Sequence, residues 1–187
     1  MQRCFDWVIA LGPILGVLGC SDPVPASSAV GLSLSLSQTA SCPILAGVPD
    51  DIGNPPPNAL TTGMGTRVYD GDGGVSVSCS VKTGGNGTYF VQASVSSSDP
   101  RVSINIQNGS IQANGSGNAL IGLSARALPA DVLSPTASPC SLSVVEPIAD
   151  HVKAGAIWMR FNCPTLSSPP TYNCNASGEI VLENCKK

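Results

Sequence analysis

Residues 75–81 read Val-Ser-Val-Ser-Cys-Ser-Val, a strict alternation of apolar and hydroxyl-bearing positions around one cysteine. Successive side chains of a β-strand point to opposite faces of the sheet, so this pattern predicts a strand with one buried face and one face in water. The same alternation recurs in residues 30–36, 89–95 and 102–107. No apolar stripe of about ten residues or more follows the 3.6-residue spacing of a helix. The chain is therefore predicted to be all-β.

Four further segments are rich in strand-forming residues: 119–127, 140–146, 155–163 and 178–185. The chain is thus expected to form about eight or nine strands, chiefly antiparallel. This spacing favours a disulfide-stapled two-sheet β-sandwich, and a closed β-barrel is the alternative. Residues 42–66 and 164–174 contain few strand formers and are predicted to be long loops.

Asn-Gly pairs mark the predicted hairpin turns. Asn-Gly is typical of two-residue turns between antiparallel strands, because both residues tolerate a positive φ. Each pair is expected to reverse the chain between two neighbouring strands. The three pairs are Asn86-Gly87, Asn108-Gly109 and Asn114-Gly115.

The first twenty residues form a separate unit. An apolar run from Trp7 to Gly19 is too short to span a membrane as a stable helix, which indicates a secretory signal peptide. The run ends in Val17-Leu18-Gly19-Cys20, which resembles the lipobox of bacterial lipoprotein precursors. The alternatives are an ordinary signal peptide that contains a cysteine and a short N-terminal membrane helix.

The lipobox resemblance implies an organisation and a location for the chain. Residues 1–19 are removed, and the thiolate of Cys20 takes a diacylglycerol group, so the mature protein is a lipoprotein that carries palmitate or a similar acyl chain. Residues 20–29 form a lipidated N-terminus and flexible tether, and residues 30–187 form one β-sandwich domain. Ser21, which follows the cysteine, suggests anchoring in the outer membrane of a Gram-negative cell envelope.

Six cysteines remain after Cys4 leaves with the signal peptide and Cys20 takes the lipid. An even number in an exported chain predicts three disulfides. A zinc site is not favoured, because no Cys-x-x-Cys pair occurs and the single histidine, His151, lies eleven residues or more from any cysteine. The six cysteines are Cys42, Cys79, Cys140, Cys163, Cys174 and Cys185.

A meander of the last three predicted strands would set the disulfide pairing. Chain reversal would bring Cys140, Cys163 and Cys174 to the same end of the sheet. A bond between Cys140 and Cys163 would staple a hairpin, whereas a bond between Cys163 and Cys174 would close the loop after it. We expect the second arrangement, with Cys185 joined to the apolar-facing Cys79. The expected pairs are Cys163–Cys174, Cys79–Cys185 and Cys42–Cys140.

The composition limits the possible partners. The net charge is −3, and only 11% of residues are charged, against about a quarter in typical domains. This argues against nucleic-acid binding and against a polybasic membrane patch, so membrane contact is expected through the lipid alone. An aromatic content of 4% also disfavours a base-stacking surface.

Two acidic residues lie close together in Asp70-Gly-Asp72-Gly-Gly. Paired carboxylates in a flexible loop suggest a calcium site, because calcium prefers several oxygen ligands. The later acidic ligands of an EF-hand loop are missing, and Asp-Gly is typical of turns. We expect a turn that leads into the strand at 75–81, and no metal or cofactor.

Two pairs of residues suggest hydrolytic chemistry. Asp150-His151 could activate a serine, but no Gly-x-Ser-x-Gly elbow accompanies it, so a solvated loop histidine is expected. Glu179 and Glu183 share a strand face, whereas a glycosidase needs carboxyl groups on both sides of a cleft. They are predicted to be solvent-facing charges.

Trp158, Arg160 and Asn162 are the strongest candidates for a ligand-binding surface. Alternation places all three on the outer face of the strand at 155–163. An outward tryptophan beside a guanidinium and an amide suits a glycan, through ring stacking and hydrogen bonds. The alternative is that Trp158 is covered by a loop or strand, as large aromatic side chains usually are.

The C-terminal part of the chain contains a cysteine-rich pattern of Ile157-Trp158, Cys163-Pro164, Cys174 and Cys185. This pattern is similar to that of small exported β-proteins of Gram-negative bacteria, and the similarity implies no activity. The chain is expected to be a lipid-anchored, non-enzymatic structural, adhesion or interaction module with an envelope glycan or protein as partner. A carbohydrate- or small-ligand-binding lipoprotein is the alternative, followed by a hydrolase.

Overall fold

A computed structural model describes residues 26–45, 50–53, 67–144, 151–168 and 172–187. The predicted signal peptide, Cys20, most of the predicted tether and Asp150 lie outside the described residues. The described elements, in chain order, are β1 (Ala29–Ser37), β2 (Val68–Tyr69), the 3₁₀ turn η1 (Asp72–Gly74), β3 (Val75–Thr83), the 3₁₀ turn η2 (Gly85–Gly87), β4 (Tyr89–Ser98), β5 (Arg101–Ile111), β6 (Ser116–Ala125), β7 (Val132–Leu133), β8 (Cys140–Val144), β9 (Val152–Lys153), β10 (Ala156–Ser168) and β11 (Tyr172–Glu183).

The strand predictions are confirmed. Each of the eight predicted segments coincides with a strand of five residues or more, and only the two-residue strands β2, β7 and β9 were not predicted. Strands of that length are too short to show an alternating pattern. Burial follows the sequence pattern in β3, where Val75, Val77, Cys79 and Val81 are buried and the serines at positions 76 and 78 are exposed.

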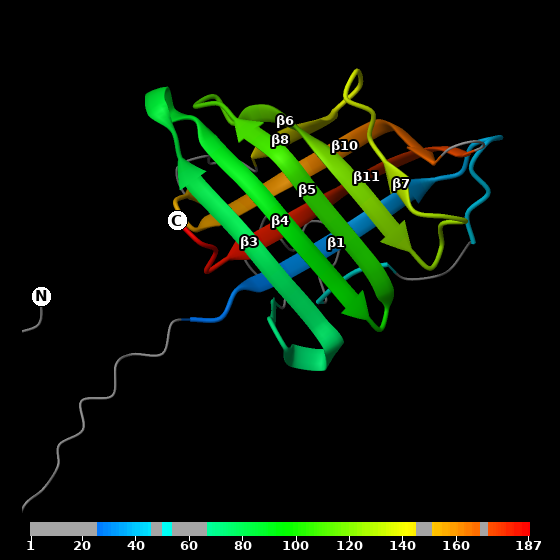
Figure 1. Cartoon of the computed structure of the whole chain (residues 1–187), viewed down its shortest axis with the longest axis horizontal. Helices are drawn as coiled ribbons and strands as arrows, with labels where there is room; N and C mark the ends of the chain where they lie inside the picture. The colour runs from blue at the N-terminus through cyan, green and yellow to red at the C-terminus, as the bar shows by residue number, and fades with distance from the viewer. Residues whose placement is uncertain (1–25, 46–49, 54–66, 145–150, 169–171) are drawn as a thin grey trace, which may run out of the picture.

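The strands form one antiparallel sheet in the order β2-β1-β11-β10-β7-β6-β5-β4-β3, with β8 bridging β10 and β6, and β9 pairing with β10. Figure 1 shows the sheet folded over, so that β3 to β6 cross β1, β10 and β11. We call β3–β6 the hairpin layer and β1, β10 and β11 the mixed layer. The predicted all-β, two-layered architecture is confirmed, and its two layers are halves of one continuous sheet. In the described part of the chain the end strands β2 and β3 do not pair, so the sheet stays open.

The core lies between the two layers. One buried cluster includes Val81 and Ile104 of the hairpin layer together with Leu32, Met159 and Phe161 of the mixed layer. Burying an aliphatic or aromatic side chain of this size stabilises a fold by about 1.5–3 kcal/mol. Packing between the layers is therefore a major source of stability.

Two of the three predicted Asn-Gly turns are confirmed. Asn86 has a φ of 57° in the turn between β3 and β4. Between β5 and β6, the Oδ1 of Asn114 accepts hydrogen bonds from the backbone N (3.0 Å) and the hydroxyl (2.7 Å) of Ser116. Both turns use the conformational tolerance of asparagine and glycine.

The prediction for Asn108-Gly109 is wrong. Asn108 has a φ of 52°, but the pair lies inside β5 at a β-bulge, where the register with β4 and with β6 shifts. Gly109 lies so close to β4 that a Cβ would sit 2.6 Å from the carbonyl oxygen of Val91. The turn between β4 and β5 is Asp99-Pro100, which joins the end of β4 directly to the start of β5.

The predicted loop at 164–174 is also wrong. β10 continues to Ser168, and β11 begins at Tyr172. The register shifts between Cys163 and Leu166, after which Leu166 pairs with Cys174. Because of this β-bulge, β10 and β11 stay paired through a segment whose sequence does not alternate. In the other predicted loop, residues 46–49 and 54–66 lie outside the described residues.

All six cysteines are paired, as predicted. The bond Cys79–Cys185 is confirmed, whereas the expected pairs Cys163–Cys174 and Cys42–Cys140 are wrong. The observed pairs are Cys42–Cys174 and Cys140–Cys163.

The register of the strands explains the two wrong disulfide pairs. Ser141 pairs with Asn162, so the next residues outward, Cys140 and Cys163, are cross-strand neighbours with a Cα–Cα distance of 4.3 Å. Cys174 instead lies farther along the β10–β11 hairpin, where Cys42 is the partner it meets. Three disulfides place the domain in an oxidising, exported environment.

The segment that enters β1 is hydrogen-bonded to the end of β11. The side-chain amide of Asn184 donates a hydrogen bond to the carbonyl of Ser27 (3.0 Å), and the hydroxyl of Ser28 donates to the carbonyl of Asn184 (3.2 Å). The start of the domain is thus fixed to the end of β11. Among the described residues, no helix has the length and apolar character needed to cross a membrane.

Candidate functional site

The outer face of β10 carries the three residues predicted to bind a ligand. Trp158 is half-buried and Arg160 and Asn162 are exposed, while Ile157 and Met159 point into the core. The predicted orientation is therefore confirmed. The structure does not make one surface of the three, however, because Trp158 borders one groove and the other two residues border another.

Trp158 is surrounded by polar and aromatic groups. The ring of His151 stacks on it with centroids 4.6 Å apart and an interplanar angle of 23°, and the guanidinium carbon of Arg67 lies 4.7 Å from the ring centroid. The indole Nε1 donates a hydrogen bond to Glu183 Oε1 (3.3 Å), which also pairs with Arg67 Nε (3.3 Å). Cation–π and stacking contacts of this kind hold the ring in place. Trp158 is therefore covered by neighbouring side chains and does not form an open platform for ring stacking.

The groove beside Trp158 remains a candidate for a small ligand. It is open, has a volume of about 380 Å³, and is lined by His151, Lys153, Trp158, Glu183 and other residues near the end of β11. Aromatic edges next to one carboxylate and the two ammonium groups of Lys153 and Lys187 can hold a polar ligand by ring contact and hydrogen bonds.

The second groove, of about 430 Å³, lies over β8, β10 and β11. Arg160 Nε donates a 2.6 Å hydrogen bond to Glu179 Oε1, and the Glu179 side chain is only 17% exposed. Glu179 and Glu183 were predicted to be solvent-facing charges, and both are instead engaged by a side chain of β10. The cross-strand register, which the sequence does not show, brings Arg160 opposite Glu179.

Asp70 and Asp72 form the predicted turn. Asp70 Oδ1 accepts a 2.7 Å hydrogen bond from the backbone N of Val77, and Gly71 has a φ of 92°. The carboxylate of Asp70 thus fixes the chain as it enters β3. In the described part of the chain, no group of three or more His, Cys, Asp or Glu side chains is placed to hold a metal ion.

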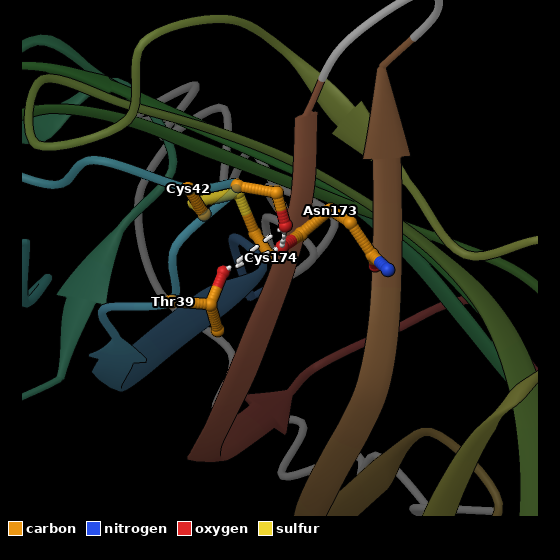
Figure 2. The surroundings of a disulfide bond; sticks show 5 residues. Thr39, Cys42, Asn173 and Cys174 are labelled. Atoms are coloured by element: carbon orange, nitrogen blue, oxygen red, sulfur yellow. Dashed lines mark hydrogen bonds between the residues drawn. A yellow bond between two sulfur atoms is a disulfide. The ribbon is translucent and has the colours of Figure 1, made fainter.

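The Cys42–Cys174 disulfide lies in a small polar network (Figure 2). The hydroxyls of Thr39 (2.9 Å) and Ser41 (3.2 Å) both donate to the carbonyl of Asn173. The backbone N of Asn173 donates in turn to the carbonyl of Ser41 (3.2 Å). These bonds fix the segment after β1 to the start of β11, and their role is structural.

Asp50 is a buried acidic residue that no sequence pattern indicated. It is 5% exposed, and its Oδ1 has no hydrogen-bond partner among the described residues. Burial raises the pKa of this carboxyl group, and Asp51 adds to the rise, while a hydrogen bond to the backbone of Ala127 opposes it. Asp50 precedes a second acidic residue, Asp51, and such a pair gives no sign in the sequence that the fold will bury one of them.

Comparison with known proteins gives no relative to argue from. No protein-family model, curated protein or solved structure matches this chain. The chemistry of the chain's own residues is therefore the only guide to its function.

Proposed function

We propose that this protein is a lipid-anchored module of the bacterial cell envelope that acts by binding a partner rather than by catalysis. The three disulfides fit an exported domain. The resemblance of Val17-Leu18-Gly19-Cys20 to a lipobox supports the anchor. Two or more acyl chains on Cys20 would hold the protein far more firmly than one.

The main support for a binding role is the polar outer face of the hairpin layer. Ser78, Ser94 and Asn105 are cross-strand neighbours in one row over β3, β4 and β5. The adjacent row on one side contains only serines, namely Ser76, Ser96 and Ser103. Hydroxyl and amide groups donate and accept hydrogen bonds without titrating near neutral pH. Such a surface is suited to hold a polar partner and not to transfer protons.

Acyl labelling tests the anchor. We expect the wild-type chain to incorporate labelled palmitate and to partition into detergent, and the Cys20→Ser variant to do neither, because a serine hydroxyl cannot replace the thiolate. Cys4→Ser is the matched control, since this cysteine lies within the predicted signal peptide, and it should keep the label. Wild-type protein that takes no label would refute the lipoprotein assignment.

The groove beside Trp158 supports a second candidate, a small-ligand or glycan receptor. Trp7 lies in the predicted signal peptide, so Trp158 is the single tryptophan of the mature chain and its fluorescence reports on this groove directly. A screen of glycans and small polar ligands should then find a compound that shifts the emission of the wild-type chain. Trp158→Phe has no tryptophan in the mature chain, so its binding is measured by isothermal titration calorimetry, and loss of binding there would locate the site. A screen without any shift would leave the polar face of the hairpin layer as the binding surface.

A further inference from the structure

All four lysines of the chain gather at one corner of the molecule. Lys82 is at the end of β3, Lys153 is in β9, and Lys186 and Lys187 follow β11. Figure 1 shows the C-terminus beside the end of β3. We call these four residues the lysine corner.

Backbone hydrogen bonds bring the lysine corner together. Val81 N donates to the carbonyl of Lys186 (2.9 Å), and Gly155 N donates to the carbonyl of Val81 (2.9 Å). Cys185 N donates to the carbonyl of Gly155 (2.8 Å), and the Cys79–Cys185 disulfide fixes the C-terminal segment to β3. Each lysine is next to one of these residues or two positions away from one.

Glu183 lines a groove with Lys153 and Lys187, but no lysine of the corner forms an ion pair within the described residues. All four side chains belong to exposed residues. The two ion pairs within the described residues, Arg67–Glu183 and Arg160–Glu179, include no lysine. Collecting like charges is unfavourable for the compact state, because the four ammonium groups repel one another. An anionic partner would offset this repulsion.

The lysine corner is also the place where the chain enters the domain. Asn184, two residues before Lys186, is hydrogen-bonded to Ser27 and Ser28. Cys20 precedes Ser27 by seven residues, and seven extended residues span at most about 25 Å. A lipid on Cys20 would therefore hold this corner, rather than the opposite end of the strands, near the bilayer surface.

We propose that the lysine corner binds the anionic phospholipid headgroups of the membrane in which Cys20 is anchored, and so orients the domain. The inference rests on the lipid anchor of the proposed function. Lys82, Lys186 and Lys187 also border an open groove of about 560 Å³ over β3–β5, whose lining includes the hydroxyls of Ser78 and Ser80. Ammonium and hydroxyl groups together are suitable donors for a phosphate.

This inference revises one expectation from the composition. The low overall charge argued against a polybasic membrane patch, because the four lysines lie in three separate parts of the sequence. The fold concentrates them at one surface. A basic residue near an anionic membrane strengthens binding about fivefold, so four together give a several-hundredfold preference for anionic over neutral lipid.

The test uses the mature chain, residues 20–187, with Cys20→Ser so that no lipid is attached. All described strands, the core and the three disulfides lie within this chain. Its binding is measured by co-sedimentation with vesicles of phosphatidylcholine, alone or with about 30% phosphatidylglycerol. We expect binding only to the anionic vesicles, and it should weaken as salt rises.

Two double variants with the same change in net charge locate the interaction. Lys186→Gln with Lys187→Gln should weaken binding to anionic vesicles about 25-fold. Arg101→Gln with Arg126→Gln should leave it nearly unchanged, because Arg101 begins β5 at the end farther from Lys82. Equal losses in both variants would show a response to net charge alone and would overturn the proposal.

Two further outcomes would overturn the proposed membrane contact. Equal binding to neutral and anionic vesicles, or none to either, refutes the lysine corner as a membrane contact. Tighter, lysine-dependent binding to a soluble anionic polysaccharide such as dextran sulfate than to anionic vesicles would assign the corner to a glycan instead. Since the tested chain carries no lipid, these results are independent of palmitate labelling, and failure of the anchor and failure of the corner are distinguished.

Discussion

The two layers of this sheet are assembled in different ways. In the hairpin layer each strand pairs with the next strand in the chain, from β3 to β6. In the mixed layer β1 pairs with β11, so that Ala29 lies opposite Glu183. All three disulfides attach segments at or beside the mixed layer, and none joins two strands of the hairpin layer. Short turns are sufficient to set neighbouring strands in register, whereas segments far apart in sequence are held by covalent bonds.

A large effect is expected from cutting the Cys79–Cys185 bond, which joins the two layers. Cys79→Ala with Cys185→Ala removes a link between residues 106 positions apart and should lower the free energy of unfolding by about 4–5 kcal/mol. Cys140→Ala with Cys163→Ala opens a link of only 23 positions and should cost about 3 kcal/mol. The reason is the greater chain entropy that the longer closed loop removes from the unfolded state. Urea unfolding followed by circular dichroism measures both, and a larger loss for the shorter link would contradict the entropic account.

A smaller effect is expected from adding one methyl group to each layer. Gly178 of β11 lies against the backbone carbonyl of Ser33 and the ring of Phe161, so Gly178→Ala should destabilise by about 1–3 kcal/mol through overpacking. Gly122 of β6 is the matched control, because its Cβ would meet Leu133 at 3.5 Å, an ordinary contact.

Gly122→Ala should therefore leave stability unchanged or raise it by about 0.5–1 kcal/mol. Thermal and urea unfolding of the two variants give the comparison. If both substitutions lower the free energy of unfolding by the same amount, the close contacts around Gly178 do not explain why glycine is needed there.

The smallest expected effect concerns Asp50, in the segment that follows β1. Because burial raises the pKa of this carboxyl group, ionisation disfavours the folded state. The protonated carboxyl group therefore adds fully to the free energy of unfolding below the unfolded pKa of about 3.9. This stabilisation is lost as the pH rises through the raised folded pKa.

Asp50→Asn removes this titration. The stability of the variant relative to wild type should increase as the pH rises above the unfolded pKa of about 3.9, and should level off above the raised folded pKa. Urea midpoints across this range test the prediction. Parallel stability curves for the two chains would mean that Asp50 titrates alike in the folded and unfolded states.

Local periodicity explains which parts of the architecture could be predicted. Alternation over residues 75–81 depends only on the two-residue period of a strand, so it identifies both the strand and its buried face. The Asn-Gly turns at Asn86 and Asn114 follow from backbone preference in the same local way. Asn108-Gly109 has the same chemistry yet forms a bulge, because the pairing of β5 with both neighbours, and not the dipeptide, decides whether the chain reverses.

The candidate sites were predictable only in part. The outward orientation of Trp158 follows from its position in β10, but the contacts that surround it do not. Arg67 and Glu183 reach Trp158 from segments 91 and 25 residues away in the chain. The four lysines give no pattern in the sequence at all, since no two of them are adjacent except at the C-terminus.

The sequence by itself determined the position of the eight longer strands, the side of each that is buried where its residues alternate, and the fact that six cysteines form disulfides. These properties depend on residues next to one another or on simple counting. The tertiary structure alone decided which cysteines meet, how Trp158 is covered, and that Lys82, Lys153, Lys186 and Lys187 share one corner. Each of these depends on strand register and on the pairing of segments distant in the chain, and register is a property of two strands together, which no single stretch of sequence contains.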